Sequence, residues 1–155
     1  MPSGEKKSLL ILDGQGGGMG RKIAERLLAE KLELEILVVG ANVAATSNMM
    51  KAGVSVGATG ENAWVYNCKR ADIIAGPLGI MLPHSMHGEI SPQMAMAAAG
   101  SEAVKIVLPM AHHEHHIRVV GLGDKGLAAL LEELAAQVKA AACGEGDSAF
   151  AGALC

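Results

Sequence analysis

The chain has 155 residues, a length typical of one domain with one hydrophobic core. Its formal net charge is −3 at pH 7, which argues against nucleic acid or an anionic membrane as a partner. Half of the residues are hydrophobic but only three are aromatic, so we expect an aliphatic core. A small domain this apolar has more apolar surface than its interior can cover, which predicts a homo-oligomer, with a tightly packed monomer as the alternative.

The first residues lack the features of a targeting segment. Residues 1–8 lead directly into a short apolar run without the longer hydrophobic stretch and cleavage site of a signal peptide, and no later run reaches membrane-spanning length. The three cysteines, Cys68, Cys143 and Cys155, show neither CxxC spacing nor the density of a disulfide framework. We therefore expect a cytoplasmic protein that binds no membrane.

Short apolar runs alternate with segments of helical period along most of the chain. The first run, SLLILDG, is nearly continuously apolar and ends at glycine, which is typical of a strand buried on both faces. In the next segment Ile23, Leu27 and Leu28 share one helical face. Asn42 and Ser91 stand where helix caps are expected. Strands are predicted over residues 8–14, 35–40, 54–57, 72–76, 104–110 and 117–121, and helices over 19–31, 42–51, 61–70, 92–99 and 123–142.

This order of elements predicts an α/β fold, a Rossmann-like three-layer sandwich with a mostly parallel sheet. Only a few residues, AHHEHH, separate the last two predicted strands, whereas a parallel crossover needs a dozen or more. An antiparallel strand pair is therefore expected near the C-terminus. We expect one domain over residues 1–155, with an ordered core at about 8–142 and a flexible tail at 143–155.

A glycine-rich turn after the first predicted strand is the strongest functional signal. Gly14, Gly18 and Gly20 fit the spacing GxxxGxG, and Gly14, Gly16 and Gly20 fit GxGxxxG, whereas strict GxGxxG and Walker A spacings both fail. Missing Cβ atoms allow backbone N–H groups at a helix start to approach a phosphate. The turn predicts a phosphate-bearing ligand, with a tight turn that binds nothing as the alternative.

The second predicted strand ends at the same edge of the sheet, where ligands of open α/β folds bind. It lacks the Asp or Glu that holds the ribose of NAD about 20 residues past the glycines, which favours NADP or a ligand that is not a dinucleotide. The polar residues there are expected to bind a neighbouring group of the ligand or to serve only as caps. The predicted cofactor-binding residues are Gly14, Gln15, Gly16, Gly17, Gly18, Met19, Gly20, Asn42, Thr46, Ser47 and Asn48.

Two loops rich in histidine carry a second hypothesis. His84 and His87 lie in one loop with Glu89, and His113 and His115 lie in the run HHEHH of another, so that both are expected at the carboxyl edge of the sheet. Clustered imidazoles with carboxylates suit Zn²⁺ or Ni²⁺, and they also suit proton transfer near neutral pH. Solvated histidines without a function remain the alternative. Copper, which Met81 and Met86 beside His84 and His87 would suggest, is less favoured because methionine mostly fills aliphatic cores.

Four segments carry a resemblance to a known family. They are DGQGGGMGRKIAERL, ANVAATSNMMKAG, GATGENAWVYNCKRADIIAGPLGIMLPHSMHGEISP and VKIVLPM. Over roughly residues 8 to 122 the chain resembles a family of small bacterial proteins classed as a domain of unknown function. The resemblance implies a bacterial cytosolic protein with a Rossmann-like fold, and it implies no activity.

The sequence therefore favours a protein that binds a nucleotide or dinucleotide with its phosphates on the glycine turn, and it leaves the reaction open. Tyr66 is followed at the fourth position by Arg70, so the Tyr-x-x-x-Lys motif of short-chain dehydrogenases is absent from the sequence and a self-contained oxidoreductase is not expected. The first alternative is a small metal-binding protein or metal-dependent enzyme that uses the histidine loops. The second is an assembly subunit without catalysis.

Overall fold

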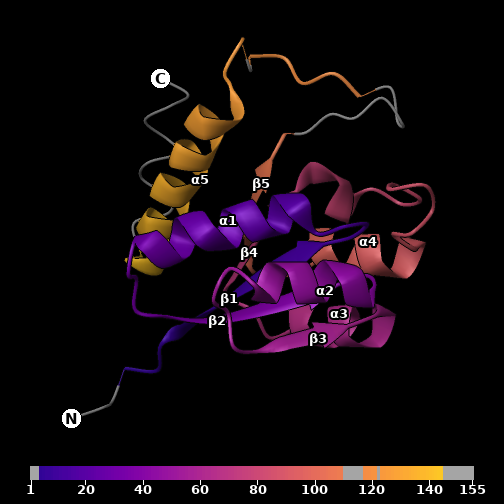
Figure 1. Ribbon diagram of the computed structural model, residues 1–155, viewed down its shortest axis with the longest axis horizontal. Coiled ribbons are helices and arrows are strands. Elements are labelled where there is room, and N and C mark those ends of the chain that lie inside the picture. Colours follow the sequence, from indigo (N-terminus) through magenta and orange to yellow (C-terminus); the bar gives the residue numbers. More distant parts are fainter. Residues whose placement is uncertain (1–3, 110–116, 122, 145–155) are drawn as a thin grey trace.

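The computed structural model describes residues 4–109, 117–121 and 123–144, and it confirms the α/β fold (Figure 1). Strands and helices alternate along the chain, and each predicted helix is present. In chain order the elements are β1 (Lys7–Asp13), α1 (Gly18–Ala29), β2 (Leu34–Gly40), α2 (Val43–Met50), β3 (Gly57–Thr59), α3 (Glu61–Cys68), β4 (Ile73–Pro77), the 3-10 helix η1 (Leu78–Met81), α4 (Pro92–Ala99), β5 (Val104–Leu108) and α5 (Leu127–Ala142).

The five strands form one parallel sheet in the order β3-β2-β1-β4-β5. The chain builds the sheet outward from β1 to β3, then returns to place β4 on the other side of β1. The strand order therefore reverses between β1 and β4. In open α/β sheets a ligand binds in the crevice at such a switch point, outside the carboxyl ends of the strands.

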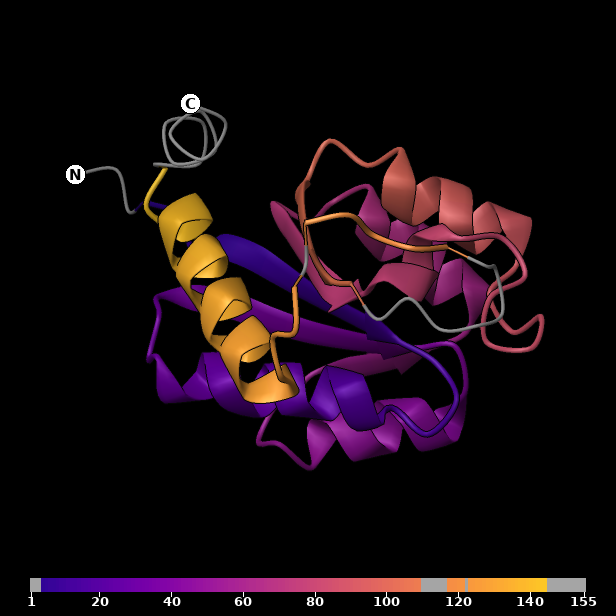
Figure 2. The ribbon, with the colours of Figure 1, turned by 90° about the horizontal axis from the view of Figure 1, so that it is seen from above.

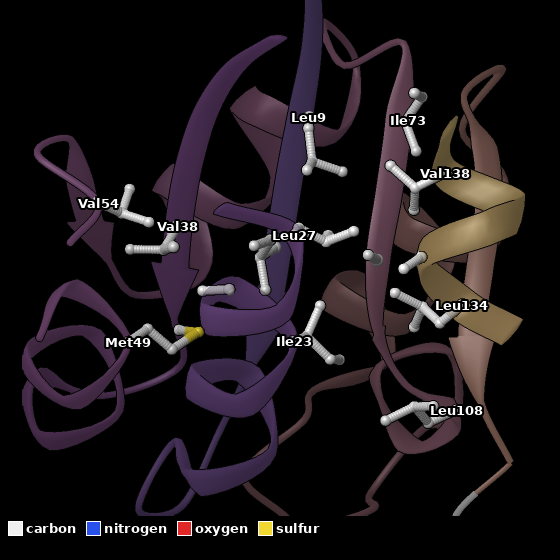
Figure 3. Packing of buried hydrophobic residues seen from close by; sticks show 14 of the residues in the cluster. Leu9, Ile23, Leu27, Val38, Met49, Val54, Ile73, Leu108, Leu134 and Val138 are labelled. Atoms are coloured by element: carbon white, nitrogen blue, oxygen red, sulfur yellow. The ribbon is translucent and has the colours of Figure 1, made fainter. Parts of the chain in front are cut away.

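Helices cover both faces of the sheet, as the view from above shows (Figure 2). Alternate residues of β1 serve the two faces, because side chains along a strand point to opposite sides. Leu9 and Ile11 face α1, α2 and α5, whereas Leu10 and Leu12 face α3 and α4. The first cluster includes Leu9, Ile23, Leu27, Val38, Met49, Ile73, Leu134 and Val138 (Figure 3). Two hydrophobic cores, the second of which includes the fully buried Trp64, thus hold β1 at the centre of the sheet.

The antiparallel strand expected over residues 117–121 does not form. Those residues are irregular and then turn, with a φ of 89° at Gly121, and the side chain of Val120 is 97% exposed. The short apolar run was wrongly interpreted as a strand, because apolar composition alone does not provide a partner to pair with. Smaller shifts occur elsewhere, since β3 starts three residues later than the strand predicted from residue 54, and α5 starts at Leu127 rather than at residue 123.

The two outer strands of the sheet differ in length and exposure. β3 has three residues, whereas β5 has five and leaves Val104 48% exposed. An exposed apolar edge is compatible with self-association, so the expected homo-oligomer stays a prediction. Across the described ranges, no helix combines the length and apolarity needed to cross a bilayer.

Candidate functional site

Asp13 ends β1 and organises the turn that follows. Its side chain is 4% exposed, and its two carboxylate oxygens accept hydrogen bonds from the Gly14 N–H at 2.8 Å and the Gly20 N–H at 2.6 Å. The Gly17 N–H donates to the Gly14 carbonyl at 2.9 Å, which closes the turn just before α1 begins. One buried carboxylate therefore joins the strand end to the first turn of the helix.

Burial raises the pKa of the Asp13 carboxyl above its ordinary value, because the ionised form is poorly solvated inside the protein. The N–H groups of Gly20 and Gly14 oppose this shift by stabilising the ionised form, and the negative charge of Glu89 adds to it. Two backbone N–H groups thus stabilise the ionised form of Asp13, but burial and the charge of Glu89 together destabilise it more.

The inner side of the turn packs against α2. Gly17 has a φ of 70°, in the left-handed region, and a Cβ atom there would lie 2.5 Å from the carbonyl oxygen of Ala45. Both observations exclude a side chain at this position. The predicted glycine requirement is real here, but it serves the contact between the turn and α2 rather than a ligand.

The outer side of the same turn is open. A Cβ atom built on Gly16 or Gly18 would meet no other atom within 4 Å. In the part of the chain that the structure describes, the backbone N–H groups of Gly16, Gly18 and Met19 donate to no protein acceptor. These N–H groups lie at the positive end of α1, whose aligned peptide dipoles favour an anion there.

The polar side chains of α2 are mostly used within the protein. Asn42 caps α2, as predicted, by accepting from the Ala45 N–H at 2.8 Å, and its amide nitrogen donates to the Gln15 carbonyl at 2.9 Å. Thr46 is 7% exposed and its hydroxyl accepts from the Gly40 N–H at 3.1 Å. These contacts brace the turn and the end of β2, whereas Ser47 is exposed.

Asn48 links the turn to a cation. Its amide nitrogen donates to the Gly16 carbonyl at 2.9 Å, and its amide oxygen accepts from the Arg21 guanidinium at 3.1 Å. Arg21 also pairs with Glu25 at 2.8 Å. A single amide group thus separates the guanidinium, itself paired with Glu25, from the Gly16 carbonyl on the α2 side of the turn.

The loop after β4, residues 78–91, contacts the first two residues of the turn. Both carboxylate oxygens of Glu89 accept from the Gln15 N–H, at 3.1 and 3.2 Å, and the Asn42 amide nitrogen also donates to Glu89. A Cβ atom on Gly14 would lie 2.7 Å from the sulfur of Met86. The histidine-bearing loop and the glycine turn therefore meet at the carboxyl edge of the sheet, as the topology predicted.

This loop has an unusual backbone. His84, Met86 and His87 all have φ between 57° and 64°, in the left-handed region that such residues rarely adopt. The loop is held by hydrogen bonds from the His84 N–H to the Ile90 carbonyl at 2.7 Å and from the Ile90 N–H to the Ser85 carbonyl at 3.2 Å. Backbone strain of this kind persists only where surrounding contacts enforce it, and it is concentrated at functional sites.

The described residues do not support the hypothesis of a metal site formed by the histidine loops. Over the described ranges, no group of three or more His, Cys, Asp or Glu side chains gathers in an arrangement that could hold a metal ion. His113 and His115 lie outside the described residues, so the site that His84 or His87 would share with them stays a prediction.

The sequence analysis did not predict that Asp13 holds the glycine turn, and it assigned Glu89 to the histidine group rather than to a contact with Gln15. Asp13 was part of the quoted glycine motif, and its position at the last residue of a buried strand could have marked it. Glu89 entered only as a member of the histidine group, because nothing in the sequence brings residue 89 next to residue 15. Its contact with Gln15 depends on how the loop after β4 folds back.

The fold and the edge where these residues meet define a doubly wound, Rossmann-like α/β protein. The chain belongs to the family described as domain of unknown function DUF3842, whose model matches residues 8–143, and this confirms the resemblance stated from the sequence. A search of curated proteins finds no match.

Among solved structures, the chain is similar to a dodecameric FMN-dependent Ubix-like decarboxylase from Escherichia coli O157:H7. The identity is 13% and the TM-score is 0.40, with 85% of this chain and 91% of that chain covered. At these values the likeness carries no conclusion about ligand, activity or assembly.

Proposed function

We propose that the protein binds a nucleotide, with a phosphate group held by the backbone N–H groups of Gly16, Gly18 and Met19. The observation that carries this proposal is the open outer side of the turn, where these donors have no protein acceptor and no Cβ atom covers them. A phosphate oxygen would supply the missing acceptors, and the start of a 12-residue helix would stabilise its charge.

The position of the turn in the sheet supports the same ligand site. The turn follows β1, next to the point between β1 and β4 where the strand order reverses. Loops from both strands meet here, since Glu89 of the loop after β4 contacts Gln15 of the turn. A ligand bound here would therefore touch two loops that are far apart in the sequence.

The local charges allow a phosphate despite two nearby carboxylates. The Asp13 carboxylate is buried and accepts hydrogen bonds from two N–H groups inside the turn, which partly offset its charge. The Glu89 carboxylate likewise accepts from the Gln15 N–H. Arg21, which Asn48 connects to Gly16, is paired with Glu25 at 2.8 Å and adds little net charge. An anion on the outer side of the turn would thus be favoured by the dipole of α1.

A thermal-shift screen followed by calorimetric titration tests the proposal. Wild-type protein is incubated with adenine and guanine mononucleotides, NAD, NADP, FMN and coenzyme A. At a concentration of one hundred times Kd, the bound nucleotide should raise Tm by about 5–10 °C. Gly18→Val should abolish this shift without unfolding the protein, because the added side chain projects into the proposed phosphate space, where a Cβ atom on residue 18 has no neighbour within 4 Å.

Gly126→Val is the matched control. Gly126 precedes α5, a Cβ atom there also meets nothing within 4 Å, and its φ of −72° suits any residue. This variant should bind the nucleotide as wild type does. If no nucleotide stabilises folded wild-type protein, or if Gly18→Val and Gly126→Val behave alike, the proposal is wrong.

A further inference from the structure

Glu89 reaches the end of β2, although it belongs to the loop after β4. β2 ends at Gly40, and Asn42, two residues later, donates its side-chain amide to Glu89. The Gln15 N–H of the glycine turn donates to both oxygens of the same carboxylate. The carboxylate therefore lies beside the glycine turn and the end of β2, between the two segments that flank a nucleotide in a doubly wound sheet.

Many dinucleotide-binding sheets carry an Asp or Glu in this place, on β2 itself, where it holds the ribose hydroxyls. The sequence here has Gly40, Ala41 and Asn42 instead, which is why it favours NADP or a ligand that is not a dinucleotide. In the structure the loop after β4 brings the Glu89 carboxylate beside the end of β2, which has no acidic residue of its own.

We propose that Glu89 accepts the ribose hydroxyls of the bound nucleotide, so that the site selects nucleotides with a free 2′-hydroxyl group over their 2′-phosphorylated counterparts. This inference rests on the proposed function, and it adds the chemical feature that the site recognises. It also gives Glu89 a role in specificity rather than in catalysis.

The chemistry of the carboxylate supports this assignment. An ionised carboxylate offers about four acceptor positions and no donor. Gln15 shares one N–H between both oxygens and Asn42 donates to Oε1, so Oε2 keeps a free acceptor position for a ribose O–H group, and the shared Gln15 bond is weak enough to yield a second. A 2′-phosphate would offer no donor and would bring a charge of about −1.5 to −2 next to Glu89.

The surroundings of Glu89 hold its carboxylate in place before a ligand binds. The contacts to Gln15 and Asn42 fix the end of the side chain, and the hydrogen bonds from the His84 and Ile90 N–H groups hold the loop. An acceptor that is already oriented loses little entropy on binding. Because Gln15 is next to Gly16, ribose and 5′-phosphate of one nucleotide can reach the carboxylate and the open N–H groups together.

Paired titrations test the inference. Wild-type protein is titrated with NAD and NADP, and with adenosine 5′-monophosphate, its 2′-deoxy form and its 2′-phosphorylated form. The ligands with an intact ribose diol should bind about tenfold or more tightly than the 2′-phosphorylated ones, since hydrogen bonds to a charged group carry that difference. The 2′-deoxy form should bind more weakly than the parent nucleotide.

Glu89→Gln should lose affinity for NAD by about tenfold and gain affinity for NADP, because the charge that repels the 2′-phosphate is gone, so that the preference disappears. The control is Glu33→Gln, which neutralises an exposed carboxylate paired with Lys6 at 3.1 Å and should keep the wild-type ratio. If Glu89→Gln does not fold, the ratios measured on wild-type protein still decide the question.

Equal or tighter binding of NADP by wild-type protein overturns the inference but leaves the proposed function intact. So does an unchanged ratio in Glu89→Gln, or a gain in affinity for every nucleotide, which would mean that Glu89 competes with the ligand for the Gln15 N–H. Failure of every nucleotide to bind the folded protein overturns the proposed function and this inference with it.

Discussion

The inner and outer sides of the glycine turn are made of the same residue type but have opposite surroundings. On the inner side, a Cβ atom on Gly17 would lie 2.5 Å from a carbonyl oxygen of α2, and the Gly16 carbonyl is bound by Asn48. On the outer side, a Cβ atom on Gly18 would meet nothing within 4 Å. One short segment therefore serves the packing of the fold on one side and leaves donors for a ligand on the other.

This comparison shows why a glycine motif alone identifies a binding site so poorly. Five of the seven residues from 14 to 20 are glycine. Some of them are required because a neighbouring backbone is too close, and a turn that binds nothing would need those as well. Only the glycines of the open side favour a ligand, and mutations on the two sides should differ in sign as well as in size.

The largest effect is expected for Gly17→Ala. The added Cβ atom would collide with the Ala45 carbonyl, and alanine would have to keep a φ of 70°. Overpacking and the left-handed backbone together should lower the free energy of unfolding by about 2–4 kcal/mol. Urea denaturation followed by circular dichroism measures the change, with Gly126→Ala as the control that should stay near wild type. A Gly17→Ala protein as stable as the control would contradict the packed inner side.

Asp13→Ala should have the next largest effect. The variant leaves the N–H groups of Gly14 and Gly20 without their buried acceptor, which should cost about 1–3 kcal/mol of unfolding free energy. Asp72→Ala is the exposed counterpart, since Asp72 accepts from the Ser8 N–H at 2.7 Å near solvent, and it should cost less. Equal losses in the two variants would mean that burial of Asp13 does not matter.

The stability difference between wild type and Asp13→Ala should also depend on pH. Because the pKa of Asp13 is raised in the folded state, the folded chain holds more protons than the unfolded one between the two pKa values. The contribution of Asp13 to stability should therefore fall as the pH rises from about 4 through the folded pKa. Urea titrations of both proteins at several pH values measure this, and a difference that grows with pH would show that the N–H bonds outweigh desolvation.

The features that sequence analysis predicted well are those decided by near neighbours. Asn42 and Ser91 cap helices as expected, because a cap depends on N–H groups two or three residues away. The strand, glycine turn and helix at the start of the chain follow from local periodicity in the same way. The prediction failed at residues 117–121, where an apolar run needs a distant partner to become a strand.

The candidate site was predictable only in part, for the same physical reason. Topology was sufficient to place the glycine turn and the loop after β4 at one edge of the sheet. The contact of Glu89 with Gln15 joins residues 74 positions apart, and no local pattern specifies it. The open and packed glycines could not be told apart either, since that difference comes from the approach of α2.

Asn48→Ala should produce a smaller loss, because it disconnects α2 from the turn without creating a clash. The variant removes the hydrogen bond to the Gly16 carbonyl and the one from Arg21, both partly exposed to water, and should cost about 0.5–1.5 kcal/mol of unfolding free energy. The adjacent and exposed Ser47→Ala is the control, which urea denaturation should find within about 0.5 kcal/mol of wild type. If both variants match wild type, Asn48 does not brace the turn.

Gly18→Ala should have the smallest effect on stability, and its sign should be opposite to that of Gly17→Ala. Gly18 is the first residue of α1, and a methyl group there meets no protein atom. Alanine restricts the unfolded chain more than glycine does, so the variant should be between zero and about 1 kcal/mol more stable in urea denaturation. Its affinity for the nucleotide should nevertheless fall, because the methyl group projects into the space proposed for the phosphate. A loss of stability above about 1 kcal/mol would show that the outer side is packed as well, and unchanged affinity would move the phosphate away from Gly18.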